Sequence, residues 1–451
     1  MFFLPKSLKN LIMIYNKTIL IKFLSIIIIS NVAIIFIQCN NDDYKLLLIS
    51  FDGLGHQFLK PDLTPNLYRL SKFGTTGHML PTFSTKTLPN HHSISTGLYQ
   101  NKHGIIHNQM FDDIYNEHFV DGNGKDEKWW NGNRMAVPLY IANQLEDRRR
   151  ASCCSPWIGC HAPYHGRRAK YFIRFNQSSC YYEQFDWTLM KLIDRSNPAN
   201  LALMYIHEPD SIGHKYGPYG WQTKQKVRRV DRFVGFIYNR LKQLNLTTKI
   251  NIIILSDHGL ADARPYRSIV MESFLNKTWY DAYGSNPVYT LKVRKGFETV
   301  VRKILEPYRI NNCKLKQSAK TFCVYSQQQI PKRYQYDYNG RIFDYLLLAN
   351  EGWSVYKTDK DKQRSKSSFG QHGYDNQLNI MRPLFIAFGP SFRQQYYHHN
   401  RFINVDLYPL MLKLLNMSPN QYYHQGKWIN VRSMLKQQYL LEKNKKNSNL
   451  K

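Results

Sequence analysis

Short apolar runs recur along the chain from residue 44 and alternate with stretches of helical periodicity. Four runs have the length and composition of buried parallel strands, and they are 45–50, 201–206, 250–255 and 384–388. Between the second and third runs, apolar residues recur at spacings of three and four, which predicts a helix with one buried face. These residues are Val227, Val230, Val234, Ile237, Leu241 and Leu244. Strands that alternate with helices predict an α/β fold with a mostly parallel central sheet and helices on both faces.

The most apolar run of the chain lies near its N-terminus, at residues 23–37. Lysines precede it and aspartates follow it, an asymmetry that places the N-terminus in the cytoplasm and the remaining chain outside. The run is short for a membrane span, which needs about 17–25 residues, and its basic flank is long for a signal peptide. Residues 1–43 are therefore predicted to be a signal peptide or a signal anchor. The protein is then extracellular, either secreted or a single-pass type II membrane protein that contacts the membrane only through this segment.

The rest of the chain is predicted to form one large domain followed by a tail. Residues 44–420 carry the alternating strands and helices, and the less regular segment 290–335 is predicted to insert at one edge of the sheet. After Met417 the sequence becomes rich in Gln, Lys and Asn. Residues 421–451 are therefore predicted to be a basic, polar C-terminal tail.

Basic residues outnumber acidic ones along the whole chain of 451 residues. There are 62 Lys and Arg against 32 Asp and Glu, a formal net charge of +30. This excess favours acidic partners such as nucleic acid, acidic glycans, anionic membranes or phosphate-rich substrates. The sequence contains neither a paired Cys/His finger nor a basic zipper, so no dedicated nucleic-acid-binding module is predicted.

Seven cysteines fit an exported protein. Cys39 lies in the N-terminal segment, and the even number that remains predicts disulfides without fixing any pairing. The remaining cysteines are Cys153, Cys154, Cys160, Cys180, Cys313 and Cys323. The residues after Cys154 lack the Arg that a sulfatase nucleophile motif needs, which argues against that class of enzyme. Sequons for N-glycosylation agree with export, and they are Asn176, Asn245, Asn276 and Asn416.

Acids and histidines follow the predicted strands. Because ligands of open α/β sheets bind beyond the carboxyl ends of the strands, these side chains are expected to converge. They are Asp52, Asp210, His214, Asp257, His258 and, further along the chain, His372. A lone Asp or His at a strand end is more often a cap or a surface residue. Six together, with oxygen and nitrogen donors and few thiols, suit two zinc-like ions.

A candidate nucleophile lies at the start of a predicted helix. The segment 82–90 reads TFSTKTLPN and leads into HHSISTGL, so that Thr87 stands where the helix begins. A metal ion would lower the pKa of its hydroxyl and make it a nucleophile. Thr is also a common helix cap. The spacing alone leaves both interpretations open.

Eight ordered motifs resemble those of the ectonucleotide pyrophosphatase/phosphodiesterase family, within the alkaline phosphatase superfamily. They are SFDG, TPNLYRL, TKTLPNHHSISTGLY, HGIIHNQMFD, EPDSIGHKYGP, SDHGL, GQHGYDN and FIAFGPSF, and they extend from residue 45 to about 415. The chain resembles the short members that have only the catalytic domain, which implies that 44–420 is an alkaline-phosphatase-like phosphodiesterase domain with two Zn²⁺ ions.

The resemblance also implies a role for each matching residue. Ligands of one zinc would be Asp210, His214 and His372, and those of the other would be Asp52, Asp257 and His258 with the nucleophile Thr87. Asn108 matches an Asn that donates a hydrogen bond to a phosphoryl oxygen. The aromatic residue that stacks on a nucleobase falls near Tyr171 or Phe172, although the motif around it departs from the family pattern.

The resemblance implies an extracellular hydrolase of nucleotide phosphodiester or pyrophosphate bonds that forms a covalent threonine intermediate. One alternative is a hydrolase of choline phosphodiesters, of the glycerophosphocholine or sphingomyelin type. Another is a secreted polyanion-binding protein without catalytic activity, which a complete set of predicted ligands makes less attractive. The net charge of +30 favours a polyanionic nucleotide over a cationic choline head group.

Overall fold

The computed structural model describes residues 45–120, 124, 126–132, 134–147, 150–309, 321–337, 340–365 and 367–440. These residues belong to one compact unit, Tyr44–Lys451. The predicted signal segment 1–43 lies outside the described residues. Among the helices that are described, none combines the length and the apolar character needed to cross a membrane.

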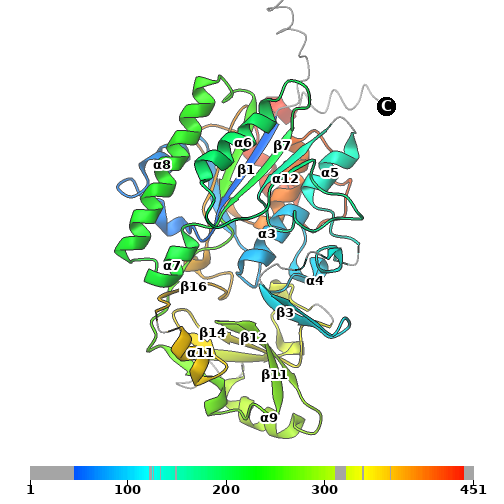
Figure 1. Ribbon diagram of the computed structural model, residues 1–451, viewed down its shortest axis with the longest axis vertical. Helices are drawn as coiled ribbons and strands as arrows, with labels where there is room; N and C mark the ends of the chain where they lie inside the picture. Colours follow the sequence, from blue (N-terminus) through cyan, green and yellow to red (C-terminus); the bar gives the residue numbers. More distant parts are fainter. Residues whose placement is uncertain are drawn as a thin grey trace, which may run out of the picture. The chain divides into compact units, whose positions relative to one another are not determined.

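The centre of the unit is an eight-stranded sheet, shown in Figure 1. In spatial order its strands are β18 (Tyr396–Ile403), β2 (Thr75–Leu80), β17 (Phe385–Phe388), β8 (Ile250–Leu255), β1 (Lys45–Phe51), β7 (Leu201–Ile206), β5 (Ser152–Ser155) and β6 (Tyr171–Phe172). Neighbouring strands are parallel except where β17 pairs with β2 and β8. The mostly parallel sheet is therefore confirmed, but the run 384–388, predicted as a parallel strand, is antiparallel.

Three buried strands at the middle of the sheet place the predicted site residues side by side. The strands β7 and β8 are buried at every residue, and β1 at every residue after Lys45. The strand β1 pairs in parallel with β7 on one side and β8 on the other, with Ile49 opposite Met204 and Ile254. Their carboxyl ends therefore reach the same edge of the sheet, one strand apart.

Helices cover both faces of the sheet, as predicted (Figure 1). On one face lie α2 (Pro65–Phe73), α6 (Tyr181–Ile193) and α8 (Trp221–Gln243), and on the other lie α5 (Leu139–Glu146) and α12 (Leu407–Leu414). The predicted apolar stripe of α8 is buried from Val227 to Leu241. Leu244 is the exception, because it is the residue that ends the helix and is 38% exposed.

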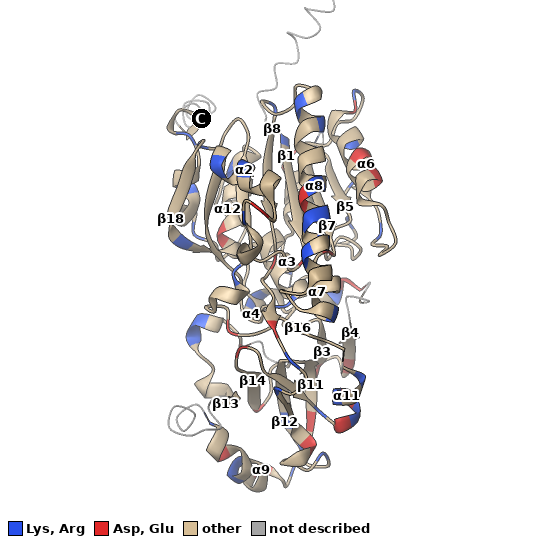
Figure 2. Cartoon of the chain, turned by 90° about the vertical axis from the view of Figure 1, so that its left-hand side faces the viewer, with Lys and Arg blue, Asp and Glu red and all other residues tan. Residues whose placement is uncertain are grey.

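The exposed side of α8 is strongly basic, as the blue segments in Figure 2 show. Its exposed cations are Lys224, Arg229, Arg232, Arg240 and Lys242. The only acidic residue of the helix, Asp231, is buried and accepts hydrogen bonds from the backbone N–H groups of Asn66 and Leu67 in the first turn of α2. Asp231 thus caps α2 and leaves the cations of α8 without an acid on their own helix.

A second sheet replaces the irregular insertion predicted for 290–335. Its order is β11 (Tyr280–Ser285), β12 (Val288–Val293), β14 (Tyr345–Ala349) and β13 (Phe322–Ser326), and every pair is antiparallel. Helix α9 (Glu298–Leu305) packs against it through Val301 and Leu305. A buried ion pair, with Arg341 Nε 2.6 Å from Asp112 Oδ2, joins this region to the hairpin of β3 (Gln109–Asp112) and β4 (Glu117–Val120).

The core extends beyond the predicted domain boundary at residue 420. Helix α13 (Trp428–Val431) contributes Val431 to the same apolar cluster as α12, and Met434, Leu435 and Tyr439 follow it there. Residues 428–440 therefore pack as part of the domain. Residues 441–451 lie outside the described part of the chain.

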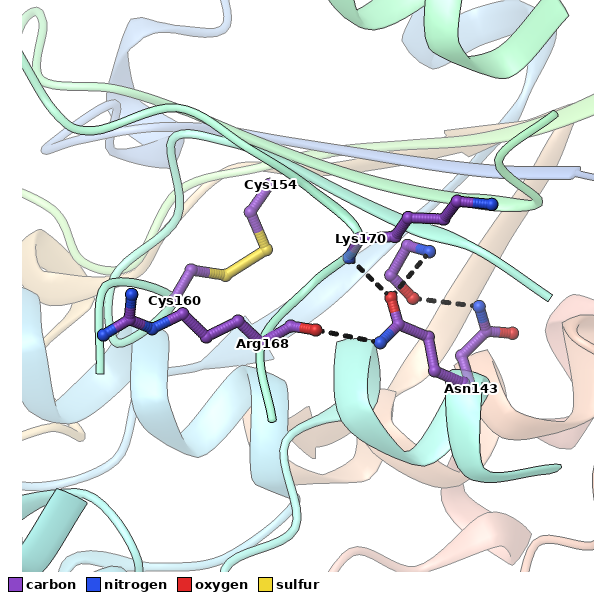
Figure 3. Close-up of a disulfide and its surroundings, with 7 residues drawn as sticks. Asn143, Cys154, Cys160, Arg168 and Lys170 are labelled. Carbon is purple, nitrogen blue, oxygen red and sulfur yellow. Dashed lines mark hydrogen bonds between the residues drawn. A yellow bond between two sulfur atoms is a disulfide. The ribbon is translucent and has the colours of Figure 1, made fainter. Parts of the chain in front are cut away.

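The cysteines behave differently from one another. Cys154 and Cys160 form a disulfide that ties β5 to the loop after it, as Figure 3 shows, and Cys323 is also disulfide-bonded. The prediction of disulfides is therefore confirmed for three cysteines, whereas Cys153 and Cys180 are free thiols and do not pair. Alternate strand residues point to opposite faces, which sends Cys153 into the core on the other side of the sheet from Cys154.

Candidate active site

The predicted ligands come together at the carboxyl ends of three adjacent strands. Asp52 follows β1, and Asp257 with His258 follows β8. After β7, helix α7 (Asp210–Tyr216) begins at Asp210 and carries His214 one turn later. His372 arrives from a distant part of the chain, directly after β16 (Gly370–Gln371). The structure therefore gathers all six side chains that the sequence singled out, while their role as metal ligands stays a prediction.

These side chains form two overlapping groups of potential ligands. In the first group, Asp210 Oδ2 lies 3.2 Å from His214 Nε2, and Asp210 Oδ1 lies 3.9 Å from His372 Nε2. In the second group, His258 Nε2 lies 3.3 Å from Asp52 Oδ1. Within each group one donor atom per residue lies within 4.8 Å of the others. Asp210 belongs to both groups.

The position of Asp257 differs in detail from the predicted ligand set. The second group contains Asp52, His258 and Asp210, where the sequence suggested Asp52, His258 and Asp257. Asp257 is nevertheless adjacent, because its Oδ2 lies 3.0 Å from His258 Nε2. Its other oxygen accepts a hydrogen bond from the backbone N–H of Gly53.

Backbone carbonyl groups orient all three imidazoles in the same way. Each Nδ1 lies within hydrogen-bond distance of a carbonyl oxygen: His214 to Gly370 at 2.9 Å, His258 to Gly259 at 2.9 Å and His372 to Thr85 at 2.8 Å. In a neutral ring that donates from Nδ1, the Nε2 atom is unprotonated, and Nε2 is the atom that faces the carboxylates. Such outer bonds are typical of metal-binding histidines.

Three buried carboxylate oxygens of the site have no hydrogen-bond partner. They are Asp52 Oδ1, Asp210 Oδ1 and Asp257 Oδ2. Leaving a buried carboxylate oxygen unpaired is unfavourable by about 1–3 kcal/mol or more. A bound cation would satisfy all three at once, so the donor set and its unpaired oxygens fit a divalent metal centre.

The pKa values of the carboxyl groups also indicate that the site needs a cation. Burial, followed by the charges of Asp257 and Asp210, raises the pKa of Asp52 well above its ordinary value. Burial acts in the same direction on Asp210, but the charges of His214 and His372 outweigh it and hold its pKa below the usual range. The chain alone therefore does not stabilise the ionised form of every carboxylate in the cluster.

Thr87 faces this cluster from the first residue of α3 (Thr87–Thr96), a helix buried at all ten positions. Its Oγ1 lies 3.4 Å from His258 Nε2. The N-cap residue is Lys86, and its side chain makes no capping hydrogen bond. The helix-cap interpretation of Thr87 therefore does not hold, and its hydroxyl is directed at the candidate ligands.

Asn108 is held beside Thr87 by the start of the same helix. Its Oδ1 accepts a hydrogen bond of 2.9 Å from the backbone N–H of Leu88, one of the N–H groups without a partner inside the helix. This bond fixes the orientation of the side-chain amide. Its NH₂ group is then available to donate to an oxygen near Thr87.

The two residues that were predicted to stack on a nucleobase lie at the edge of the central sheet. Tyr171 and Phe172 form β6, the edge strand, where the Tyr171 hydroxyl donates to the carbonyl of Asn197 at 2.7 Å and Phe172 packs against the core. Phe175, three residues later, is 52% exposed, and its ring centroid lies 5.8 Å from that of Tyr205. The site therefore adjoins Phe175 instead of β6.

Two aromatic residues near the site, Tyr205 and Phe175, were not predicted from the sequence. The Tyr205 hydroxyl donates a hydrogen bond of 2.6 Å to Asp52 Oδ2. Tyr205 and Phe175 line a cavity of about 240 Å³ with His207 and Trp187. A tyrosine in an otherwise aliphatic strand requires a buried partner, which is a usable signal for Tyr205. Phe175 lies in a loop without periodicity, and nothing in its local pattern marks it.

Comparison with known proteins shows the family to which the chain belongs. Residues 46–375 match the model of the type I phosphodiesterase / nucleotide pyrophosphatase family, so the chain is an enzyme of the phosphodiesterase class. The chain belongs to this family. The sequence-based assignment to the ectonucleotide pyrophosphatase/phosphodiesterase family, and to an alkaline-phosphatase-like fold, is thereby confirmed.

Curated relatives span most of the chain. The human bis(5'-adenosyl)-triphosphatase ENPP4 is 37% identical over 378 residues, which are 83% of this chain and 79% of that protein. Human ectonucleotide pyrophosphatase/phosphodiesterase family member 5 is 33% identical over 84% of this chain and 75% of its own length. Venom phosphodiesterase 2 of Crotalus adamanteus is 30% identical over 83% of this chain but only 45% of its own length.

Solved structures of family member 5 agree with the fold. The murine protein, solved as an inactive threonine-to-alanine variant in complex with AMP, superposes with a TM-score of 0.79 at 30% identity, covering 87% of this chain and 100% of that one. The human protein gives a TM-score of 0.78 at 31% identity over 87% of this chain and 99% of that one.

Proposed function

We propose that this phosphodiesterase and nucleotide pyrophosphatase works outside the cell with two zinc ions and a covalent threonine intermediate. The observation that carries the proposal is the convergence of six oxygen and nitrogen donors, with three unpaired buried carboxylate oxygens, around the hydroxyl of Thr87.

Two sets of residues would hold the ions. Asp210, His214 and His372 would bind one, and Asp52, Asp257 and His258 would bind the other. When bound, such ions lower the pKa of a neighbouring hydroxyl and neutralise negative charge on a phosphoryl group. The fixed Nδ1 bonds of the histidines keep their Nε2 atoms directed at the ion positions.

Residues of the chain itself would carry out the transfer of the phosphoryl group. The Thr87 oxygen attacks phosphorus, the bond to the leaving oxygen breaks, and the phosphoryl group remains esterified to Thr87. Water hydrolyses this ester and regenerates the hydroxyl. Asn108 donates a hydrogen bond to a non-bridging oxygen throughout, from an amide that Leu88 N–H holds in place. The inactive threonine variant of the murine neighbour supports a threonine nucleophile.

Nucleotides are the substrate class that we propose. Phe175 offers a half-exposed ring beside the cavity next to Tyr205, where a base can stack. The name of the human relative, a bis(5'-adenosyl)-triphosphatase, and the AMP bound to the murine neighbour favour nucleotides over choline phosphodiesters. An extracellular setting is supported by the apolar segment 23–37 and by the ectonucleotidase names of the relatives.

The proposal is tested by metal analysis and a hydrolysis panel. Purified protein is expected to contain close to two zinc ions, and chelation is expected to abolish hydrolysis of a nitrophenyl nucleotide diester, which added zinc restores. In the panel, diadenosine polyphosphates and ATP are expected to be cleaved faster than glycerophosphocholine or sphingomyelin. Activity that survives complete removal of bound metal would contradict the mechanism, and preferential cleavage of a choline ester would contradict the substrate class.

A further inference from the structure

A second cluster of charged groups lies away from the proposed active site, at the β18 edge of the central sheet, which Figure 2 shows at one side of the molecule. In the parallel pair of β18 and β2, Arg401 stands opposite His78. Between β17 and the 3-10 helix 379–381 lies Arg382, whose carbonyl accepts a hydrogen bond of 2.9 Å from the backbone N–H of His56. Four segments distant in the sequence thus bring two arginines and two histidines together.

This cluster, which we call the edge cationic cluster, contains no acid. Among the described residues, no carboxylate lies within ion-pair distance of His56, His78, Arg382 or Arg401. Burial and the Arg382 charge lower the pKa of His56 to about 4, and burial with both arginines lowers that of His78 to about 4. At neutral pH both imidazoles are therefore uncharged, and the two arginines lack a counter-charge.

Two buried nitrogen atoms of the cluster also lack hydrogen-bond partners. They are Arg382 Nε and His56 Nδ1. The hydroxyl of Tyr397 on β18 lies beside the Arg382 side chain and raises its pKa against the larger effect of burial. Arg401 and Tyr397 are exposed, so the cluster is open to solvent. Unpaired donors beside accessible cations are the features of an anion site.

We propose that the edge cationic cluster is an accessory binding site for a phosphoryl dianion, either inorganic phosphate or the terminal phosphate of a nucleoside monophosphate. Two guanidinium groups match the charge of a dianion and present planar donors suited to phosphate oxygens. Two permanent cations exclude a metal ion. The dianion would accept hydrogen bonds from Arg382 Nε and His56 and would offset the mutual repulsion of the two arginines.

The accessory site is separate from the proposed metal centre. The metal-centre residues follow β1, β7 and β8, whereas His78 and Arg401 lie on β2 and β18. The nearest of these strands to β2 is β8, two positions away in the sheet, which corresponds to roughly 10 Å at about 4.8 Å per strand. A phosphate bound at the edge would not occupy the position of a phosphoryl group attacked by Thr87.

Phosphate binding to the full-length, metal-loaded protein tests the inference. Equilibrium dialysis with labelled inorganic phosphate at constant ionic strength gives the phosphate bound per chain, and AMP is the second probe. Arg401→Gln is expected to weaken one class of bound phosphate at least tenfold while leaving nucleotide hydrolysis and its inhibition by phosphate unchanged. Arg382→Gln is expected to do the same, and Tyr397→Phe to weaken binding less, since one donor is lost but no charge.

Arg232→Gln is the matched control, because it removes an exposed arginine from α8 and should leave phosphate binding unaltered. Should Arg382→Gln fail to fold, the exposed positions Arg401 and Tyr397 still decide the question. Identical binding curves for wild type and Arg401→Gln would overturn the accessory site, as would an equal loss in Arg232→Gln. Neither result depends on whether the chain hydrolyses nucleotides, so the proposed function is judged separately.

Discussion

At the scale of single residues, the site depends on neighbours that fix protonation and direction. Three backbone carbonyls set the tautomer of the imidazoles, and the Tyr205 hydroxyl directs one oxygen of Asp52. Burial, followed by the charge of Asp52, raises the pKa of Tyr205 well above its ordinary value, so the hydroxyl stays protonated and donates. The residues next to the candidate ligands are therefore as important to the site as the ligands.

Tyr205→Phe tests this dependence. The variant keeps the ring in the core but removes the hydrogen bond to Asp52, so zinc affinity is expected to fall by about 10–100-fold with little loss of stability. The measurement is zinc retained against increasing concentrations of a competing chelator. Tyr266→Phe, at a position that is 75% exposed, is the control and should behave as wild type. Unchanged zinc retention in Tyr205→Phe would mean that Asp52 needs no such support.

Thr87 gives a sharper test, because the structure removes its capping role. Thr87→Ala is expected to lower turnover by a factor of about 10³ or more, since the covalent path is lost. Thr87→Ser should keep substantial activity, because a primary hydroxyl can attack in the same line. A lost helix cap would instead destabilise the protein by about 0.5–2 kcal/mol. Turnover beside melting temperature distinguishes the two, and an active, zinc-loaded Ala variant would move the nucleophile to another residue, with Thr85 the nearest candidate.

The site residues that can be predicted from the sequence are those that lie close to the ends of recognisable strands. Asp52, Asp210 and Asp257 lie within four residues of the ends of recognisable buried strands, so their convergence is predictable from the parallel sheet. Phe175 and the edge cationic cluster are not, since they depend on loops and on pairing between distant edge strands.

At the scale of elements, apolar runs predict where strands lie but not whether a strand is parallel or antiparallel to its neighbours. Strand β17 has the same composition as β1 and β8, yet it is antiparallel, because strand direction depends on the connections outside the run. The segment 290–335 appears irregular because its strands β12 and β13 belong to a sheet completed by β11 and β14, outside that window. Helix α3 is buried on every side although most of its residues are polar, so no amphipathic periodicity marks it and only its start is recognisable.

The buried α3 makes folding sensitive to acid through His92. Burial lowers the pKa of His92 to about 4, although its hydrogen bond to the Trp130 carbonyl opposes the shift. The unfolded chain takes up this proton near pH 6.5, so stability present above pH 6.5 is lost as the pH falls towards 4. For this one group the loss at pH 5 is about 2 kcal/mol.

His92→Gln isolates that contribution, because the Gln amide can donate to the same carbonyl without titrating. Urea unfolding at pH 7.5 and pH 5 is expected to show a smaller loss of stability for the variant than for wild type, by about 2 kcal/mol. The exposed His399, replaced in the same way, should leave the pH dependence unaltered. Parallel behaviour of wild type and His92→Gln would show that His92 is not buried in its neutral form.

At the scale of the whole described unit, the two sheets have different neighbours. The parallel sheet gathers the candidate ligands from β1, β7 and β8, and the antiparallel sheet is joined to the β3–β4 hairpin by Arg341 and Asp112. The net charge of +30 gathers in part on α8, while the proposed catalytic residues are mainly acids and histidines. Net charge therefore describes the surface of this protein and does not identify its chemistry.

Export of the whole chain is tested through its sequons. Asn176, Asn245 and Asn276 are exposed, whereas Asn416 is partly buried at the end of α12. In eukaryotic cells we therefore expect glycans at the first three positions and little at Asn416, because the transferase needs an accessible acceptor. Treatment with a peptide N-glycosidase should reduce the apparent mass, and Gln at all three exposed positions should remove that shift, while Asn416→Gln alone, the control, should not. An unglycosylated product that fractionates with the cytosol would contradict both the predicted signal segment 1–43 and the extracellular site of action.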